Sequence, residues 1–296
     1  MVPVKNALVA SVILPAFNEV AGVKETVEST AGILRDAGYV DFEILVVDDG
    51  SADDTAKVAE TSGARVIRNL QNMGYGYSLK RGIREASHDI IVIADADSTY
   101  PVREIPRMVE LHKQGYHMVV GQRTGFRDRP VKMPLRLVLR WLVEFTTGRR
   151  IPDANSGFRV FSRNDILPHL DRLSDKYSFT TTMTVAYMLC HLYVIYVPVE
   201  YRKRTGHTTV SVFRDTLQTF QFIVQTILFY NPIKIFLASA LLIAVPSIAL
   251  IVVGFALGGP LATFAGVLGL LTAALVVVLG FLSEQLRQIL IISDDK

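Results

Sequence analysis

Short apolar runs alternate with amphipathic stretches along the first 123 residues of the chain. The apolar runs predict buried strands, and the stretches between them repeat apolar residues at helical spacing. The predicted strands are residues 10–17, 42–51, 64–69, 89–97 and 117–123, and the predicted helices are residues 19–38, 53–63, 74–87 and 101–115. Strands that alternate with helices indicate a mostly parallel sheet covered on both faces, which is an α/β domain.

A long apolar region near the carboxyl end forms a second pattern. No Asp, Glu, Lys or Arg occurs from Ile235 to Ser283, and a Gly-Gly-Pro sequence at 258–260 interrupts this region. A helix needs ~20 apolar residues to span a bilayer, so each half is long enough for one crossing. Soluble cores seldom contain such a long run without charge. We therefore predict transmembrane helices over 232–257 and 261–282 rather than a buried helical hairpin.

Composition and charge agree with a membrane protein. Half of the 296 residues are hydrophobic (50%), and the mean hydropathy of +0.33 is too high for an ordinary soluble enzyme. Nearly all Lys and Arg residues precede Ile235, so the positive-inside rule predicts that both chain ends lie in the cytoplasm. We expect no signal peptide, because the apolar run 7–17 is short and fits a strand. The single Cys190 excludes an internal disulfide and fits a reducing compartment.

These patterns predict four segments: a cytoplasmic α/β domain (1–212), an interfacial amphipathic helix (213–231), a two-helix transmembrane hairpin (232–283) and a cytoplasmic tail (284–296). Residues 127–150 also fit a helix on the membrane surface, or alternatively a core helix with a solvated edge. The second span has a small-residue face, which would allow a homo-oligomer through the transmembrane helices. That face consists of Gly266, Gly269, Ala273 and Ala274.

Two carboxylates, Asp95 and Asp97, follow a buried strand directly. Neighbouring ionised groups repel each other, and burying either is costly unless a cation or a hydrogen-bond donor compensates. A solvated turn at the strand end is the alternative interpretation. Asp48, Asp49 and Arg123 also fall at predicted strand ends. Functional groups gather at the carboxyl ends of parallel strands, which favours a site over a simple turn.

Six motifs in order resemble glycosyltransferase family 2. The subgroup that they resemble most is the polyprenyl-phosphate sugar synthases, of which dolichol-phosphate mannose synthase is typical. The resemblance covers about residues 8–212, and the two following spans match membrane-anchored members. The motifs are VILPAFNE (12–19), VVDDGSADDT (46–55), NMGYGYSLKRGI (72–83), ADADSTYP (94–101), VVGQR (119–123) and DANSGFRVFSR (153–163).

This resemblance implies a GT-A fold, a nucleotide-sugar donor, a divalent cation and an inverting transfer. Carried over to this chain, it makes Asp95 and Asp97 the ligands of Mg²⁺ or Mn²⁺. The chemistry agrees, because these ions prefer oxygen ligands and often take only one or two protein carboxylates beside phosphate oxygens. Some members place a Gln ligand where this chain has Thr99. A hydroxyl is a weaker ligand, so water would replace it there.

The resemblance also implies the donor site. Glu19 and Asp48 can accept hydrogen bonds from ribose or base, whereas Pro15 and Phe17 could equally be ordinary loop and core residues. Arg123 would contact the donor diphosphate or the acceptor phosphate, with a surface ion pair as the alternative. The glycine-rich stretch 74–82 lacks a phosphate-loop pattern, and we expect it near the donor with Lys80 as a charge partner. The full donor set is Pro15, Phe17, Glu19, Val46, Asp48, Asp95, Ala96, Asp97 and Arg123.

The acceptor site is expected in the basic stretch 197–211. The family pattern is an Arg, a Gly and a Ser-Lys pair, and either Arg204 or Lys203 matches the Arg. The expected Lys is Thr209 here, and Arg202 or His207 could substitute. A solvated basic linker beside anionic lipid is the alternative. Farther upstream, Arg136 and Arg140 would seat the acceptor headgroup at the membrane surface.

One position of the family pattern lacks an acid. Some relatives carry a Glu where this chain has Thr182. An alcohol acceptor needs a general base, but a lipid phosphate is already anionic near neutral pH. Asp153 is the remaining acid that could lie near the reacting centre, and Arg159 could hold it. The predicted catalytic residues are therefore Asp97, Arg123 and Asp153.

The expected activity is transfer of one hexose from a UDP- or GDP-sugar to undecaprenyl or dolichyl phosphate at the cytoplasmic face of the cell membrane. We expect no nucleic-acid partner. A processive polysaccharide synthase is the first alternative, although Leu137 replaces the Gln of its Gln-x-x-Arg-Trp pattern and two spans are too few for a channel. The second alternative is a membrane scaffold without catalysis, which the acids and Arg123 argue against.

Overall fold

A computed structural model describes residues 8–125, 141–202 and 212–294 of the chain. The chain divides into two compact units, residues 1–223 and 224–296. The first unit holds the predicted sheet and its helices, and the second holds the two long apolar helices.

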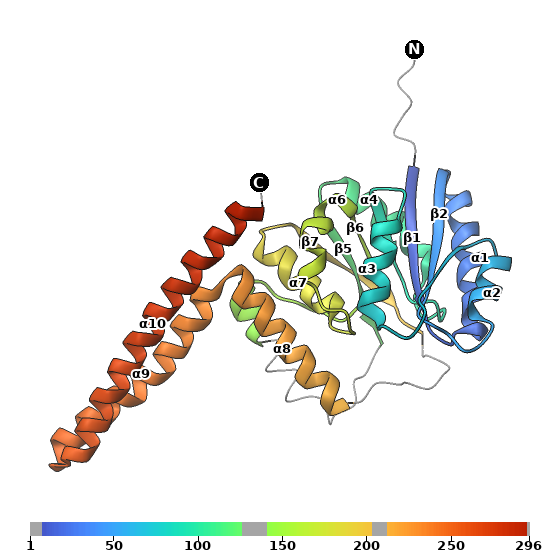
Figure 1. Ribbon diagram of the computed structural model, residues 1–296. Coiled ribbons are helices and arrows are strands. Elements are labelled where there is room, and N and C mark those ends of the chain that lie inside the picture. Colours follow the sequence, from blue (N-terminus) through green and yellow to red (C-terminus); the bar gives the residue numbers. More distant parts are fainter. Residues whose placement is uncertain (1–7, 126–140, 203–211, 295–296) are drawn as a thin grey trace. The chain divides into compact units, whose positions relative to one another are not determined.

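A seven-stranded sheet forms the centre of the first unit, with the strand order β3-β2-β1-β4-β6-β5-β7 (Figure 1). The neighbouring strands are parallel except at β6, which runs antiparallel to both β4 and β5. The mostly parallel α/β sheet is therefore confirmed, and β6 and β7 complete it. The strands are β1 (Leu8–Ala16), β2 (Tyr39–Asp48), β3 (Arg65–Arg68), β4 (Ile90–Ile93), β5 (Met118–Thr124), β6 (Arg159–Ser162) and β7 (Val194–Glu200).

Helices cover both faces of this sheet. On one face, α1 (Val20–Asp36), α2 (Thr55–Thr61) and α4 (Ile105–Lys113) contribute to the main hydrophobic core, and the 3-10 turn η1 (Val102–Glu104) packs against it. The buried positions of α1 follow helical spacing, so one stripe of the helix is apolar. The other face carries α3 (Tyr75–Glu85) and α7 (Phe179–Leu189). Two short elements, α6 (Arg163–Ile166) and η3 (Leu167–Arg172), follow β6.

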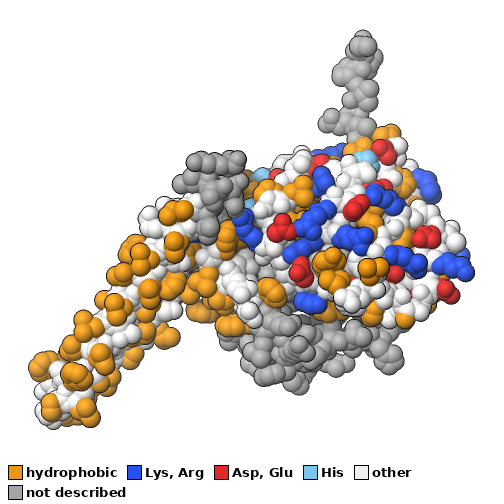
Figure 2. Space-filling model, viewed as in Figure 1, with side chains coloured by type: hydrophobic (Ala, Val, Ile, Leu, Met, Phe, Trp, Pro, Cys, Tyr) orange, Lys and Arg blue, Asp and Glu red, His pale blue; other side chains and the backbone are white. Residues whose placement is uncertain are grey.

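The second unit contains α9 (Pro232–Leu257) and α10 (Pro260–Asp294). Both helices are long and apolar enough to cross a membrane, with hydropathies of 2.7 and 2.5 over their most apolar windows. Figure 2 shows that hydrophobic side chains cover this pair, whereas charged side chains spread over the sheet domain. The first predicted span coincides with α9, and α10 continues past residue 282 through most of the predicted tail. The helix predicted over 213–231 is α8 (Val212–Tyr230), and its place at a membrane surface stays a prediction.

The small-residue face of α10 packs against α9 within this hairpin. A Cβ atom added at Gly269 would lie 2.1 Å from Ser247 Oγ, and one at Gly266 would lie 2.6 Å from the Ser247 carbonyl oxygen. A side chain at either position would clash with α9, so the glycines allow the two helix backbones to approach closely. These glycines therefore serve the contact between the two helices of one chain, and a homo-oligomer stays a prediction.

Candidate functional site

The carboxyl edge of the sheet collects the polar residues that the sequence predicts. Asp48 ends β2, Asp95 and Asp97 follow β4, and Arg123 lies near the end of β5. Because β6 runs in the opposite direction, its beginning lies at the same edge, and the segment before it carries Asp153. The antiparallel strand thus adds a second polar segment to the site.

Each of the two predicted metal ligands has a hydroxyl partner. The Tyr75 hydroxyl donates a hydrogen bond to Asp95 Oδ1 at 3.2 Å. Thr99 donates to Asp97 Oδ1 twice, from its hydroxyl at 2.6 Å and from its backbone N–H at 3.1 Å. The Thr99 side chain is buried, with 2% exposure, and the Asp97 side chain is partly exposed. Thr99 therefore orients the Asp97 carboxylate, a role that the sequence did not suggest.

Helix α1 holds the turn that carries these acids. The Thr26 hydroxyl donates to the carbonyl oxygens of Gly22 and Ala96, at 3.0 and 3.2 Å, and accepts from the Ser98 backbone N–H at 3.1 Å. Ser98 has a positive φ of 58°, a conformation uncommon outside glycine, so these bonds stabilise an otherwise unfavourable turn. At Gly22 an added Cβ would lie 3.0 Å from Asp97 Cα, which shows how closely the helix packs there.

The acids fit a divalent cation such as Mg²⁺ or Mn²⁺. Both are carboxylates on one turn, both are half-buried rather than sealed in the core, and oxygen is the donor that these ions prefer. Among the described residues no group of three or more His, Cys, Asp or Glu side chains could hold a metal. Mg²⁺ is commonly held by one or two protein carboxylates beside phosphate and water oxygens, so two acids are enough for such a site.

Arg123 and Asp153 form a close pair beside this turn. Nε and one terminal nitrogen of Arg123 each lie 2.8 Å from a carboxylate oxygen, and the Arg123 backbone N–H donates to the same group at 3.2 Å. Burial alone would raise the pKa of Asp153, but the hydrogen bonds and charge of Arg123 outweigh it and hold that pKa below its usual range. Asp153 therefore stays ionised. The guanidinium also lies 5.5 Å from the centre of the Tyr201 ring.

Arg159 has a different role from the one that the sequence suggested. Its side chain is fully buried in β6 and donates to the carbonyl oxygens of Ala154 and Ser156 and to the Thr184 hydroxyl, at 2.7–2.8 Å. The side-chain hydrogen-bond partner of Asp153 is Arg123, and Arg159 acts on this acid through its charge, without a hydrogen bond. The hydrogen bonds of Arg159 fix the backbone of the segment before β6.

Thr182, where some relatives carry an acid, is also structural. Its hydroxyl donates within α7 to the carbonyl oxygens of Ser178 and Phe179, and the residue is fully buried. The hydroxyl also accepts the Ser174 N–H at 3.4 Å, so it serves the backbone of α7 and of the segment before it.

The glycine-rich stretch starts α3 and packs against another part of the backbone. Asp49 accepts the N–H groups of Met73 and Gly74, at 2.9 and 2.8 Å, which fixes the turn before the helix. An added Cβ at Gly76 would lie 2.2 Å from the Ser174 carbonyl oxygen. Asp49 thus orients this turn, and Gly76 permits close backbone packing.

Lys80, the suggested charge partner of the donor, has another partner. Its ammonium lies 2.7 Å from Asp175 Oδ1, and its side chain is only 7% exposed. The pair joins α3 to the segment before α7, so the expectation that Lys80 serves the donor is replaced by a structural role.

The remaining predicted donor residues differ in accessibility. Pro15 and Val46 are buried, and Val46 lies in the hydrophobic core, whereas Phe17 and Glu19 are partly exposed. The Asp48 side chain is nearly buried, accepts the Ser51 N–H at 3.2 Å, and lies 3.7 Å from Arg68 Nε. Ala96 lies in the turn itself and is also buried. Of these residues, Phe17 and Glu19 are partly open to solvent, and Asp48 lies beside the charge of Arg68.

The predicted acceptor residues Arg136, Arg140, Lys203 and Arg204, together with His207 and Thr209, lie outside the described residues. The described part of the basic stretch is bound to the acidic turn, because the Arg202 N–H donates to the Thr99 carbonyl oxygen at 3.0 Å. Downstream of Arg140, residues 141–147 are helical, and Trp141 stacks on Phe145 with both side chains exposed.

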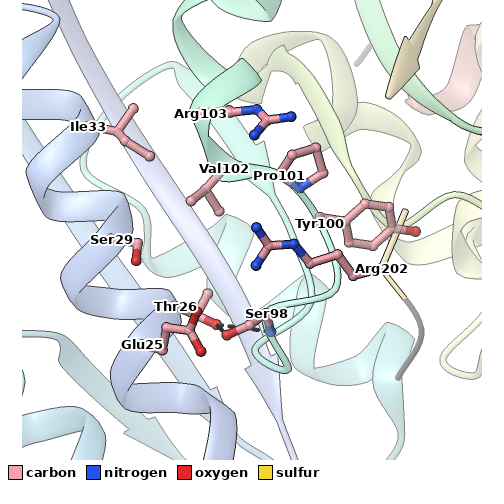
Figure 3. Close-up of a pocket in the computed structure, with 10 residues that line it drawn as sticks. All are labelled: Glu25, Thr26, Ser29, Ile33, Ser98, Tyr100, Pro101, Val102, Arg103 and Arg202. Carbon is pink, nitrogen blue, oxygen red and sulfur yellow. Dashed lines mark hydrogen bonds between the residues drawn. The ribbon is translucent and has the colours of Figure 1, made fainter. Parts of the chain in front are cut away.

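A pocket of about 200 Å³ lies behind the acidic turn, between α1 and η1 (Figure 3). Ile33 and Val102 contribute apolar lining, and the guanidinium groups of Arg103 and Arg202 lie across the pocket from α1. The pocket contains neither Asp95 nor Asp97. Ser98 and Thr26, which line the pocket, belong to the hydrogen-bond network that supports the acidic turn. The pocket therefore lies next to the site without including its two acids.

Sequence reasoning missed three tyrosines at the site. Tyr75 contacts Asp95, the Tyr100 hydroxyl accepts the Gly157 N–H at 2.9 Å, and the Tyr201 ring meets the Tyr100 ring edge-on with centroids 5.0 Å apart. Tyr75 lies in GYGY, Tyr100 lies in DSTYP, and Tyr201 lies in the basic stretch 197–211. Their position in or beside these motifs is the one sequence feature that could have indicated a role at the site, because aromatic residues by themselves are typical of a hydrophobic core.

Comparisons with known proteins identify the family of this chain. The model of "Glycosyl transferase family 2" matches residues 11–166. Undecaprenyl-phosphate 4-deoxy-4-formamido-L-arabinose transferase of Klebsiella pneumoniae (strain 342) is 32% identical over 170 residues, which is 55% of this chain and 51% of that protein. The low-salt glycan biosynthesis hexosyltransferase Agl6 of Haloferax volcanii is 30% identical over 213 residues, or 69% of this chain and 50% of that protein. The chain spans about half the length of the curated relatives it matches.

The solved structures show the same fold. Glucosyl-3-phosphoglycerate synthase from Mycobacterium tuberculosis, in complex with Mn²⁺, uridine-diphosphate-glucose and phosphoglyceric acid, gives a TM-score of 0.61 at 22% identity. The match covers 75% of this chain and 80% of that chain. This similarity confirms the GT-A fold expected from the sequence.

Proposed function

Because this chain belongs to glycosyl transferase family 2, we propose that it transfers one hexose from a UDP- or GDP-sugar to the phosphate of a polyprenyl phosphate, with inversion. The acceptor is undecaprenyl or dolichyl phosphate. Two observations support a lipid acceptor: several relatives are named undecaprenyl-phosphate sugar transferases, and two apolar helices long enough to span a membrane follow the sheet domain. The observation that carries the proposal is the oriented pair Asp95 and Asp97 at the carboxyl edge.

In this proposal Asp95 and Asp97 hold Mg²⁺ or Mn²⁺. When bound there, the ion supplies Lewis-acid stabilisation of the departing nucleoside diphosphate. The mycobacterial protein of the same fold was solved with Mn²⁺ and UDP-glucose, so these are the first ligands to test. Glu19 and Asp48 would accept hydrogen bonds from the nucleoside, beside Phe17.

Asp153 and Arg123 have separate roles toward the acceptor phosphate in this proposal. An oxygen of the lipid phosphate attacks the anomeric carbon as the bond from that carbon to the nucleoside diphosphate breaks. That oxygen is already anionic near neutral pH, so no side chain has to remove a proton. Asp153 is ionised and bound to Arg123, which makes it a weak base. Its role is to orient the guanidinium, whose charge and fork geometry suit phosphate oxygens.

The membrane supplies the second substrate in this proposal. The hairpin α9–α10 would anchor the chain, with the sheet domain at the cytoplasmic face. Arg136, Arg140, Lys203 and Arg204 are the proposed contacts of the lipid headgroup. A charged surface near anionic lipid is itself attracted to the membrane, which would keep the sheet domain close to its acceptor.

The test is a panel of UDP- and GDP-sugars incubated with the purified full chain, a short polyprenyl phosphate and Mg²⁺ or Mn²⁺. We expect one sugar per lipid, no product with a chelator, and a loss of at least a hundredfold in D97A. Asp41→Ala is the matched control, because Asp41 is exposed at the start of β2, at the opposite edge of the sheet. Full turnover by D97A would refute the proposal. A ladder of longer products would favour a processive synthase, and a chain that binds no nucleotide sugar would favour a scaffold.

A further inference from the structure

Tyr75, Asp95 and Gly157 meet at one point of the site. The Tyr75 hydroxyl lies 3.2 Å from Asp95 Oδ1. A Cβ atom added at Gly157 would lie 2.7 Å from the Tyr75 hydroxyl and 2.9 Å from Asp95 Oδ1. The three residues come from α3, the turn after β4, and the segment before β6, so the fold brings together three of the sequence motifs here.

Several contacts fix the position of Tyr75. The preceding Gly74 has a φ of 113°, a conformation that favours glycine. The Asp49 carboxylate accepts the Gly74 N–H at 2.8 Å, which holds the turn from which α3 begins. On the other side, the Tyr177 ring stacks on the Tyr75 ring with centroids 5.8 Å apart. Tyr75 therefore reaches Asp95 from a rigid support.

Gly157 is held as firmly on the opposite side. Its N–H donates to the Tyr100 hydroxyl at 2.9 Å, and the Ser156 hydroxyl before it donates to the Gly121 carbonyl oxygen at 2.6 Å. A side chain at 157 could not move away with its backbone. It would instead press on the ends of Tyr75 and Asp95, whose side-chain atoms are the three nearest to such a Cβ.

We propose that Tyr75 is a positioning residue, which holds the Asp95 carboxylate in the orientation that a divalent cation requires, and that Gly157 leaves the space in which the two side chains meet. This inference rests on the proposed function, because it assigns Asp95 to the cation. It adds a residue outside the acidic motif whose removal weakens the cation site without removing a ligand.

The tyrosine hydroxyl suits this role. A phenol hydroxyl carries a proton that it can donate, and the Tyr75 hydroxyl lies 3.2 Å from Asp95 Oδ1, so it is the donor to that carboxylate oxygen. A donor bound to one carboxylate oxygen restricts rotation of the group. Loss of such an outer partner typically weakens metal binding by about 10- to 100-fold.

Two variants and two controls test the inference. Tyr75→Phe removes only the hydroxyl, and Tyr77→Phe is its control, because the Tyr77 hydroxyl has no hydrogen-bond partner in the described part of the chain. Gly157→Ala places a methyl group against the Tyr75 hydroxyl and the Asp95 carboxylate. The atoms that it displaces are ends of side chains, so the chain should fold. Gly32→Ala is its control, because an added Cβ there meets nothing within 4 Å.

The measurement is a titration of the full chain with Mn²⁺ in detergent, in the presence of saturating UDP or GDP. Electron paramagnetic resonance reports the fraction of Mn²⁺ that is bound. We expect Y75F and G157A to weaken Mn²⁺ binding by about tenfold or more, and Y77F and G32A to leave it unchanged. Thermal unfolding midpoints of Y75F and the wild type should agree.

The outcomes separate this inference from the proposed function. If D97A abolishes Mn²⁺ binding while Y75F binds as tightly as the wild type, the role of Tyr75 is refuted and the cation site stands. If the wild-type chain binds no Mn²⁺ with either nucleotide, both are refuted. Loss of binding in Y77F equal to that in Y75F would show a general effect on the α3 turn and would also overturn the role of the Tyr75 hydroxyl.

Discussion

Arg123 on β5 and Asp153 before β6 meet through two parallel hydrogen bonds, each 2.8 Å long. Both side chains are largely buried, with exposures of 16% and 13%. Removing the charge of one partner takes away most of what compensates the burial of the other charge. We expect D153N to lower the free energy of unfolding by about 3 kcal/mol, as measured by denaturant titration of the full chain in detergent. An unchanged free energy would show that the pair contributes no net stability.

The same pair predicts a pH dependence with a definite sign. The pKa of Asp153 is lower in the folded chain than its ordinary value, because Arg123 outweighs the effect of burial. A depressed folded pKa contributes stability above the unfolded pKa, and this contribution is lost as the pH falls through the folded value. We therefore expect the wild type to lose more stability than D153N on acidification below the ordinary range of an aspartate. Parallel curves of unfolding midpoint against pH would contradict this expectation.

The Lys80–Asp175 ion pair predicts a separation of stability from substrate binding. Lys80 is nearly buried, whereas the Asp175 side chain is 54% exposed and can be solvated when its partner is removed. We expect K80M, which keeps an apolar chain of similar length, to lower the free energy of unfolding by about 1 kcal/mol. The KM for the nucleotide sugar should stay the same. A KM raised tenfold with unchanged stability would return Lys80 to the donor site.

The sequence predicted the parallel part of the fold because its signal is local. The strands β1 to β5 are apolar runs of the chain, and α1 repeats apolar residues at helical spacing. Strand β6 has only four residues, and nothing in RVFS indicates that it runs antiparallel. That direction brings Asp153 to Arg123, so the pairing of these two residues could not be derived from the pattern.

The charged residues show the same limit. Lys80 and Arg159 carry the positive charge that is typical of phosphate-binding residues, yet the fold buries both side chains and gives them structural partners. Tyr75 shows the reverse case: the glycines beside it drew attention to the backbone, while the functional group is the hydroxyl that reaches Asp95. Burial and partners depend on contacts between distant segments, which spacing along one segment does not contain.

Two threonines one turn apart on α1 give the last prediction. Thr26 and Thr30 are both buried, with exposures of 2% and 0%, but their hydroxyls differ. Thr26 bonds the acidic turn at the Ala96 carbonyl oxygen and the Ser98 N–H, whereas the Thr30 hydroxyl has no hydrogen-bond partner among the described residues. Thr→Val changes each side chain by the same atoms, so the pair is a matched comparison.

We expect T26V to lower the free energy of unfolding by about 1–3 kcal/mol, because it leaves buried polar groups of the turn unpaired. T30V should cost nothing, or add stability, because it removes a buried hydroxyl that no bond compensates. T26V should also weaken Mn²⁺ binding, since the strained Ser98 turn that carries Asp97 loses its support. Denaturant titration and Mn²⁺ titration of both variants check this. Equal effects of the two substitutions would mean that α1 stabilises the sheet only through packing, and that it does not hold the acidic turn in place.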